Sequence, residues 1–290
     1  MICIYHSRDL DGWMSAAIVK LWHEQEKIDG ELELIGWDYG QPLPVLSGEK
    51  HSELVMVDIS FPMGTMESLL DPFNVTWIDH HKSAIDECRN YFRKGNPFKG
   101  LQFSDYAACE LTWMHLFDGI KMPEIVRLLG RYDCFGHKGT DEEQKVLEFQ
   151  FAARTYLKNL SDCYQMLKYE TGQIAIPSEM TIDNLLQAGK GIYKFLCTEA
   201  EQAYANRFTI RLDGRLFACV NKERFNPINF GINYHNDGYD GFACFWYANG
   251  KYKYSLYNDN GEVDCSVIAK NRGGGGHKGA SGFISDTIIK

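Results

Sequence analysis

The sequence predicts a two-domain α/β protein: a mostly parallel sheet with flanking helices, then a smaller α+β domain, with a cleft between them. In the first half, short apolar runs alternate with segments of helical period, which is typical of βαβ units. In the last third, Asp-Gly and Asn-Gly dipeptides separate strand-like runs, as in β-hairpins. A polar stretch with Gly and Pro, residues 171–178, lies between these two parts.

Four apolar runs of the first half predict the strands of a parallel sheet. The run MICIY is followed by a helical pattern over 13–28, and LELIGW at 32–37 is the second strand. LVMVD, which ends at Asp58, is apolar enough for a strand that is buried on both faces. VTWID, which ends at Asp79, is the fourth run.

Helical patterns dominate residues 105–157, with segments at 108–117, 123–132 and 142–157. Pro123 stands where a helix tolerates proline, at its first turn. A further pattern at 181–207 indicates a connecting helix. We therefore expect a first domain at 1–177, a connecting helix at 178–207 and a second domain at 208–290.

Composition excludes several classes of protein. The chain has 290 residues, of which 44% are hydrophobic, so it is neither collagen-like, coiled coil nor disordered. Its net charge of -9 opposes binding to long duplex nucleic acid, which needs Lys and Arg on phosphates. The nine cysteines include no C-x-x-C pair, so neither a zinc knuckle nor a disulfide framework is expected. Without an apolar span or a secretory start, we expect a cytoplasmic protein that has no membrane partner.

Acidic and imidazole side chains follow three of the four predicted strands directly. Because parallel strands end at one edge of a sheet, where ligands bind, these groups are expected to converge. They are His6, Asp9 and Asp11 after the first strand, Asp58 at the third, and Asp79, His80 and His81 after the fourth.

Each of these signals alone has a structural explanation. Asp9-x-Asp11-Gly12 fits a turn with a helix N-cap, and a His-His pair is usually a surface feature. Together they favour a metal cluster, because several carboxylates at close range need cations between them. Oxygen ligands with imidazoles suit Mn²⁺ or Mg²⁺ better than Fe²⁺ or Zn²⁺.

Five segments together resemble the DHH phosphoesterase superfamily with its associated C-terminal domain. Four of them correspond to HSRDLDGWMSAAI, Asp58, the Asp79-His80-His81 tripeptide and GRYDCFG. The fifth, CSVIAKNRGGGGHKGASGF at 265–283, resembles the glycine-rich GGGH motif of the associated domain. Among the branches, the opening segment and the two-domain plan are most similar to the oligoribonuclease (nanoRNase, NrnB-type) group.

The resemblance implies a binuclear, usually Mn²⁺-dependent hydrolase of phosphate esters, with Mg²⁺ as the alternative ion. By this analogy one metal is bound by His6, Asp9 and Asp58, and the other by Asp11, Asp58, His80 and Asp133, with Asp58 bridging. Asp58, His80 and His81 are the expected catalytic residues, with His81 facing the phosphate and Asp79 orienting the histidines. His6 departs from the pattern, since it precedes Asp9 by three positions where relatives often have four.

The glycine-rich loop is interpreted either as a flexible linker or as an anion site lined by backbone. Glycines let main-chain N–H groups approach a phosphate, and the surrounding segment contains basic residues and no acid. Ser255 and Tyr257 share one face of the preceding strand, where Tyr257 either stacks on a base or only packs against its neighbours. The expected substrate-binding residues, besides His81, are Gly274, Gly275, Gly276, His277, Arg272, Lys278, Ser255 and Tyr257.

The expected function is hydrolysis of short single-stranded oligonucleotides to 5′ mononucleotides by metal-activated water. A long strand would need an extended basic groove, which the acidic composition does not favour. A phosphatase for 3′,5′-bisphosphorylated adenosine and a phosphodiesterase for cyclic mono- or dinucleotides are the rival enzymes. A catalytically silent nucleotide sensor is the rival from another class. Homodimerisation is left open by the sequence.

Overall fold

The computed structural model of the chain describes residues 1–46, 52–175, 180–223, 225–276 and 278–289. The chain divides into two compact units, Met1–Lys190 and Gly191–Lys290, which are described one at a time. The α/β fold class is confirmed: the first unit contains a parallel sheet with helices, and the second contains a mixed sheet. The domain boundary predicted at 177/178 falls on residues outside this description.

The sheet of the first unit has four parallel strands in the order β2-β1-β3-β4. These are β1 (Ile2–His6), β2 (Glu33–Trp37), β3 (Glu53–Val57) and β4 (Asn74–Ile78), close to the four predicted runs. The chain leaves β1 on one side to form β2 and returns on the other side to form β3. In open parallel sheets, ligands bind beyond the carboxyl ends of the strands at such a reversal.

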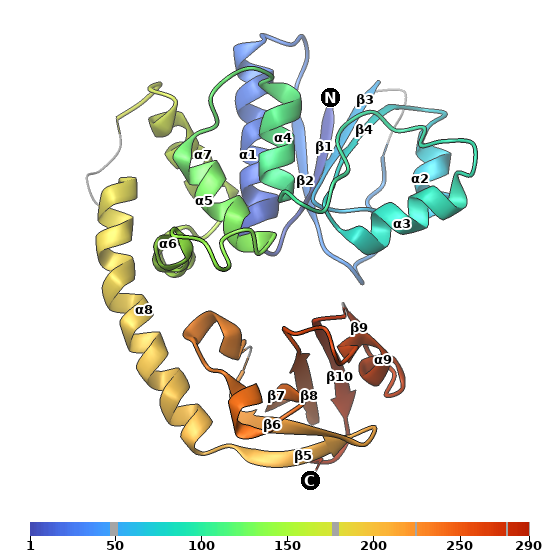
Figure 1. The fold of residues 1–290 in the computed structure, drawn as a ribbon. Helices are drawn as coiled ribbons and strands as arrows, with labels where there is room; N and C mark the ends of the chain where they lie inside the picture. Colours follow the sequence, from blue (N-terminus) through green and yellow to red (C-terminus); the bar gives the residue numbers. More distant parts are fainter. Residues whose placement is uncertain (47–51, 176–179, 224, 277, 290) are drawn as a thin grey trace. The chain divides into compact units, whose positions relative to one another are not determined.

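Helices cover both faces of this sheet, because alternate residues of each strand point to opposite sides. Ile2 and Ile4 pack in one cluster with residues of α2 (Met63–Leu69) and α3 (Lys82–Tyr91). Cys3, between them, packs in another cluster with residues of α1 (Leu10–Gln25) and α4 (Ala108–Leu116). Figure 1 shows these two pairs of helices on the two sides of the strands. The sequence analysis did not predict α2 and α3.

Helix α1 begins three residues earlier than the 13–28 pattern predicts. Asp9 caps it, since its side chain accepts a hydrogen bond from Gly12 N, and this places Asp11 inside the first turn. The helix also ends earlier, at Gln25, and Lys27 beyond it has a φ of 49°. The apolar pattern alone placed the start of the helix too late, whereas the N-cap that the Asp9-x-Asp11-Gly12 segment fits is present at Asp9.

Three further helices lie near their predicted positions: α5 (Glu124–Asp133), α6 (Glu143–Tyr156) and the long α8 (Ile182–Ala205), which continues into the second unit. Helix α7 (Leu160–Glu170) was not predicted. None of the helices in the described ranges is both long and apolar enough to span a membrane.

The second unit contains a mixed sheet in the order β5-β6-β7-β8-β10-β9. Both predicted hairpins are present. Asp213-Gly214 and Asn249-Gly250 join their strands with positive φ at both turn residues, as a type I′ turn requires. The elements of this unit are β5 (Phe208–Leu212), β6 (Arg215–Asn221), η2 (Pro227–Phe230), η3 (Tyr234–Asp237), β7 (Gly241–Ala248), β8 (Lys251–Tyr257), α9 (Cys265–Lys270), β9 (Gly275–Gly276) and β10 (Ala280–Ser285).

Candidate metal centre

The turn between β1 and α1 brings three of the predicted ligands to one place. His6 ends β1, Asp9 caps α1 and Asp11 lies in the first turn of α1. Gly12 makes this turn possible, because a Cβ at its position would lie 2.0 Å from the carbonyl oxygen of His6. The glycine of the Asp-x-Asp-Gly segment therefore serves close packing between the strand end and the helix.

Asp11 is buried and bound to the N-terminus of α4. Its Oδ2 accepts from Ala108 N at 2.9 Å, and its Oδ1 accepts from Cys109 N at 2.8 Å. Helix N-termini favour negative charge, so these bonds stabilise the carboxylate where burial disfavours it. The same two hydrogen bonds fix the N-terminus of α4 beside the first turn of α1, close to the end of β1.

Asp58 follows β3 directly and has a φ of 61°, in the left-handed region. This conformation is uncommon for residues other than glycine, although Asp and Asn tolerate it best. Its backbone N–H donates to Ile78 O of β4, and the residue is 1% exposed. The strained backbone therefore ends the strand and places a buried carboxylate at the edge where β1 and β3 meet.

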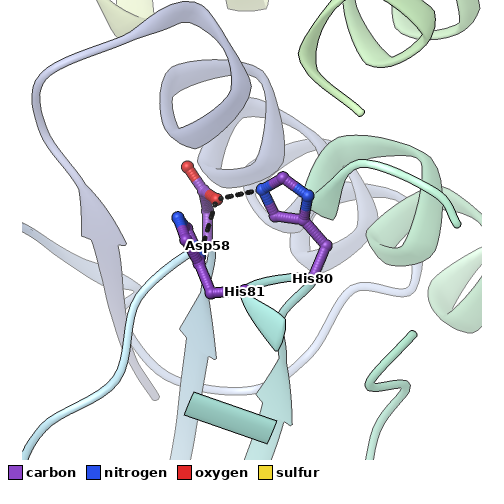
Figure 2. A group of neighbouring side chains, drawn as sticks. All are labelled: Asp58, His80 and His81. Carbon is purple, nitrogen blue, oxygen red and sulfur yellow. Dashed lines mark ion pairs between the residues drawn. The ribbon is translucent and has the colours of Figure 1, made fainter. Parts of the chain in front are cut away.

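The two histidines after β4 approach this carboxylate, as Figure 2 shows. His80 Nε2 lies 3.4 Å from Asp58 Oδ1, and His81 Nδ1 lies 3.8 Å from the same atom. Asp79 is fully buried, and its Oδ1 makes two hydrogen bonds with His81. One is to the backbone N of His81 at 3.0 Å, and the other is to Nδ1 of His81 at 2.7 Å. The other oxygen of Asp79 accepts from Trp77 Nε1, so the orientation of His81 is determined by the protein core.

Asp133 ends α5 and reaches the same place from the helical layer. Its Oδ2 lies 3.2 Å from His80 Nε2, and Asp11 Oδ2 lies 3.6 Å from that nitrogen. Arg131 ties α5 to α4 through two bonds to Glu110, of 2.9 Å and 2.5 Å. Asp11 is bound at the start of α4, and Asp133 ends α5. The Arg131–Glu110 pair joins these two helices and so helps to hold Asp11 and Asp133 close to one another.

We expect Glu110→Ala to destabilise the protein strongly. Glu110 is 2% exposed, and it also accepts from Ala107 N. Breaking a buried pair leaves the other charge uncompensated, so the free energy of unfolding should fall by about 3 kcal/mol. Urea unfolding of the metal-free protein measures this loss.

Glu142→Ala is the matched control, because Glu142 also pairs with an arginine, Arg127, but its side chain is 46% exposed. Surface pairs of this kind contribute about 0–1 kcal/mol. Equal losses in the two variants would contradict a structural role for the buried pair.

The predicted ligands form three overlapping groups in which the donor atoms lie within 4.8 Å of one another. These groups are His6, Asp9 and Asp58; Asp58, His80 and His81; and Asp11, His80 and Asp133. Among the described residues, neither His6 Nδ1 nor Asp58 Oδ1 makes a hydrogen bond, although both atoms are buried. Buried polar atoms without partners are rare, and here two of them lie among carboxylates and imidazoles that suit a divalent cation.

Proton affinities in this cluster depart far from ordinary values. Burial and then the charge of Asp58 raise the pKa of Asp11 to about 7, and burial and then Asp11 raise the pKa of Asp133 to about 7. Burial opposes protonation of His80, but Asp58, Asp11 and Asp133 raise its pKa to about 10. The acids therefore resist ionisation and the histidines hold protons, and a cation among these carboxylates would favour their charged forms.

The glycine-rich segment of the second unit forms a tight loop between α9 and β10. A Cβ on Gly274 would lie 2.1 Å from Gly282 O, and Gly276 has a φ of 135°, so both positions need glycine. Gly275 and Gly276 pair with β10. Lys278 is exposed, whereas the predicted His277 lies outside the described residues.

The other predicted substrate residues of this unit have structural partners. Arg272 donates to Asp213 at 2.8 Å and to Ile268 O at 2.9 Å, so its charge is engaged within the unit. Ser255 lies on β8, paired with Gly282 of β10. Tyr257, on the same strand, is partly buried against the cluster that contains Phe242.

The sequence analysis missed Asp38, which contacts a predicted ligand, and Glu110, which joins the helices that carry two of them. Asp38 follows β2 and lies 3.3 Å from His6 Nε2, although the reasoning applied to the other three strand ends would have found it. Glu110 is an acid within an apolar helical pattern, which indicates a buried partner. No sequence spacing identifies that partner as Arg131, which lies 21 residues further along the chain.

One of the comparisons with known proteins, with a solved structure, supports the fold. No family model matches the chain. An uncharacterized protein, R106, of Acanthamoeba polyphaga mimivirus is 23% identical over 300 residues, which cover 99% of this chain and 68% of that protein. A solved structure of PggH, a pGpG-specific phosphodiesterase from Vibrio cholerae, matches 98% of this chain and 92% of its own, with 12% identity and a TM-score of 0.51. RecJ from Thermus thermophilus, solved with Mg²⁺, matches 98% of this chain and 47% of its own, with 13% identity and a TM-score of 0.42.

Proposed function

We propose that the chain is a binuclear metal-dependent phosphodiesterase of the DHH phosphoesterase superfamily, which hydrolyses short oligonucleotides to 5′ mononucleotides. One observation carries the proposal: the buried carboxylate of Asp58 stands between two groups of potential ligands, one with His6 and Asp9, the other with His80. A carboxylate with a ligand group on each side is suited to bridging two cations.

The residues present fit two divalent ions. Carboxylate oxygens outnumber imidazoles, and no cysteine belongs to the three groups, which suits Mn²⁺ or Mg²⁺. His6, Asp9 and Asp58 would hold one ion, and Asp11, Asp58, His80 and Asp133 the other. When bound, such ions supply Lewis acidity to a phosphoryl group and lower the pKa of a water molecule.

The protein's own side chains would then bind and orient the phosphate. The bond between His81 Nδ1 and Asp79 leaves Nε2 of His81 for a phosphoryl oxygen. Asp79 is itself bound by Trp77, so His81 is held in one orientation without help from the substrate. Such pre-organisation reduces the cost of aligning donor and phosphate.

A short oligonucleotide is the substrate that the chain favours. The net charge of -9 is a poor match for a long polyanion, whereas a dinucleotide requires only local positive charge. PggH, whose fold is similar, is named for action on pGpG, which is a short substrate of this kind. The glycine loop, with the exposed Lys278, would bind a phosphate through backbone N–H groups.

Residues of the second unit would contribute unequally to this binding. Gly274, Gly275 and Gly276 would line the anion site, and His277, which lies outside the described residues, is proposed as a further contact from its place in the sequence. Arg272 would orient the loop through Asp213 more than it contacts substrate, because its guanidinium is already bound. We propose Ser255 and Tyr257 as further contacts on β8, and the cytoplasm as the location of the protein.

Single-turnover hydrolysis tests this proposal. We expect a labelled RNA dinucleotide to be cleaved with Mn²⁺ and not with chelator, and a long oligonucleotide to be cleaved much more slowly. If only 3′,5′-bisphosphorylated adenosine or a cyclic dinucleotide is hydrolysed, the proposed substrate is wrong and the proposed metal site stands. If the protein binds metal and nucleotide but hydrolyses none of these compounds, it is a nucleotide sensor and not an enzyme.

A further inference from the structure

Asp38 lies at the end of β2, beside the strand that carries His6. The two strands are parallel with His6 opposite Trp37, and Ser7 N donates to Trp37 O, so the residues that follow both strands stay adjacent. Asp38 thus occupies the same edge of the sheet as the predicted metal ligands. Asp38 itself is not a member of any of the three ligand groups found in the described part of the chain.

The Asp38 carboxylate is held between two neighbours. Its Oδ1 lies 3.3 Å from His6 Nε2, and its Oδ2 accepts from Arg8 Nη1 at 3.2 Å. Gln41 fixes the backbone of Asp38, because Asp38 N donates to Gln41 Oε1 and Gln41 N donates to Asp38 O. The side chain of Asp38 is 20% exposed, against 63% for Arg8. The contact with His6 is therefore the more sheltered of the two.

The other ring nitrogen of His6 points toward the predicted ligands. His6 Nδ1 lies 3.0 Å from Asp9 Oδ2 and 3.4 Å from Asp58 Oδ2. It is buried and makes no hydrogen bond within the described part of the chain. One nitrogen of the ring thus has the carboxylate of Asp38 as its acceptor, and the other makes no hydrogen bond but faces two carboxylates where a cation would be bound.

We propose that Asp38 is a positioning residue, which holds the proton of His6 on Nε2 and so presents the lone pair of Nδ1 to the first metal ion. A neutral imidazole carries one N–H, and an acceptor on one nitrogen selects the tautomer that leaves the other nitrogen free to ligate. This inference rests on the metal site of the proposed function.

Metal titration of three variants tests the role of Asp38. Asp38→Leu removes the acceptor, and Asp38→Asn keeps an amide oxygen that can accept from Nε2. Asp29→Asn is the matched control, because Asp29 is an exposed acid that precedes β2 where Asp38 follows it. Calorimetric titration of the metal-free proteins with Mn²⁺ reports the affinity of each site without requiring hydrolysis.

We expect Asp38→Leu to weaken binding of one Mn²⁺ by about 10- to 100-fold, as is usual when the partner of a ligating histidine is lost. Asp38→Asn should recover part of this affinity, and Asp29→Asn should match the unmodified protein. Unchanged binding in Asp38→Leu, or an equal loss in Asp29→Asn, would overturn the proposal.

A second readout covers the case in which Asp38→Leu does not fold. In the Mg²⁺-loaded protein, long-range ¹H–¹⁵N spectra should show the His6 proton on Nε2, and this preference should weaken in Asp38→Asn. A proton on Nδ1 in the unmodified protein would overturn the proposal. Because neither readout uses substrate, a protein that binds two Mn²⁺ but cleaves nothing would refute the proposed function alone.

Discussion

Asp58→Asn should abolish hydrolysis and the binding of both metal ions together. The carboxylate approaches His6 on one side and His80 on the other, so neither group of ligands is complete without it. Metal ions supply several kcal/mol of stabilisation to a charged transition state. Since about 1.4 kcal/mol corresponds to a tenfold change in rate, single-turnover hydrolysis of the dinucleotide should slow by about 1000-fold or more.

Asparagine is the informative replacement at this position because of the backbone. Asp58 has a φ of 61°, which Asn tolerates, whereas Ala adds about 1–2 kcal/mol of strain. The metal-free Asp58→Asn protein should melt no lower than the metal-free unmodified protein, because burial raises the pKa of Asp58 and disfavours its charge. Retention of two tightly bound Mn²⁺ in this variant would contradict the bridging role.

The metal-free protein should lose stability as pH rises from about 5 to about 9, and Mn²⁺ should reverse this trend. Burial and then the charge of Asp58 raise the pKa of Asp11 to about 7, and burial and then Asp11 raise the pKa of Asp133 to about 7. The folded state therefore binds more protons than the unfolded state between the ordinary value of 3.8 and about 7, so folding weakens with pH in that window.

The histidines act in the same direction at higher pH. Burial lowers their proton affinity, but nearby carboxylates raise the pKa of His6 to about 11, of His80 to about 10 and of His81 to about 9. Their stabilising contribution is complete below 6.5, their ordinary value, and is lost as pH rises through these raised values. Metal ions and protons compete for the same carboxylates and imidazoles, so the affinity of the protein for metal ions rises with pH.

Thermal melts across this pH range, with chelator and with excess Mn²⁺, measure both effects. At a free concentration of about 100 times Kd, a single bound ion adds about 2.7 kcal/mol, and the gap between the two curves should widen as pH rises. Asp58→Asn is the control, since Mn²⁺ should not raise its melting temperature. A gap that stays constant with pH would mean that the cluster does not exchange protons for metal.

Much of the candidate centre could be predicted from sequence, because strand ends are visible in the chain. His6, Asp58 and His80 each follow an apolar run, and parallel strands necessarily end at one edge. Asp133 was different. It ends a helix, so its place beside His80 was inferred only from a resemblance, and its 3.2 Å approach depends on how α5 packs.

The sequence by itself determined the alternation of strands and helices, the two I′ hairpins and the residue types that gather at the sheet edge. These features are local, since periodicity and turn chemistry act over a few neighbouring residues. Only the tertiary structure decided that Asp11 binds the N-terminus of α4, that Arg131 joins Glu110, and that Asp38 reaches His6. Those contacts join residues 21 to 98 positions apart. Packing of the helical layer and the register of β1 against β2 bring these residues together.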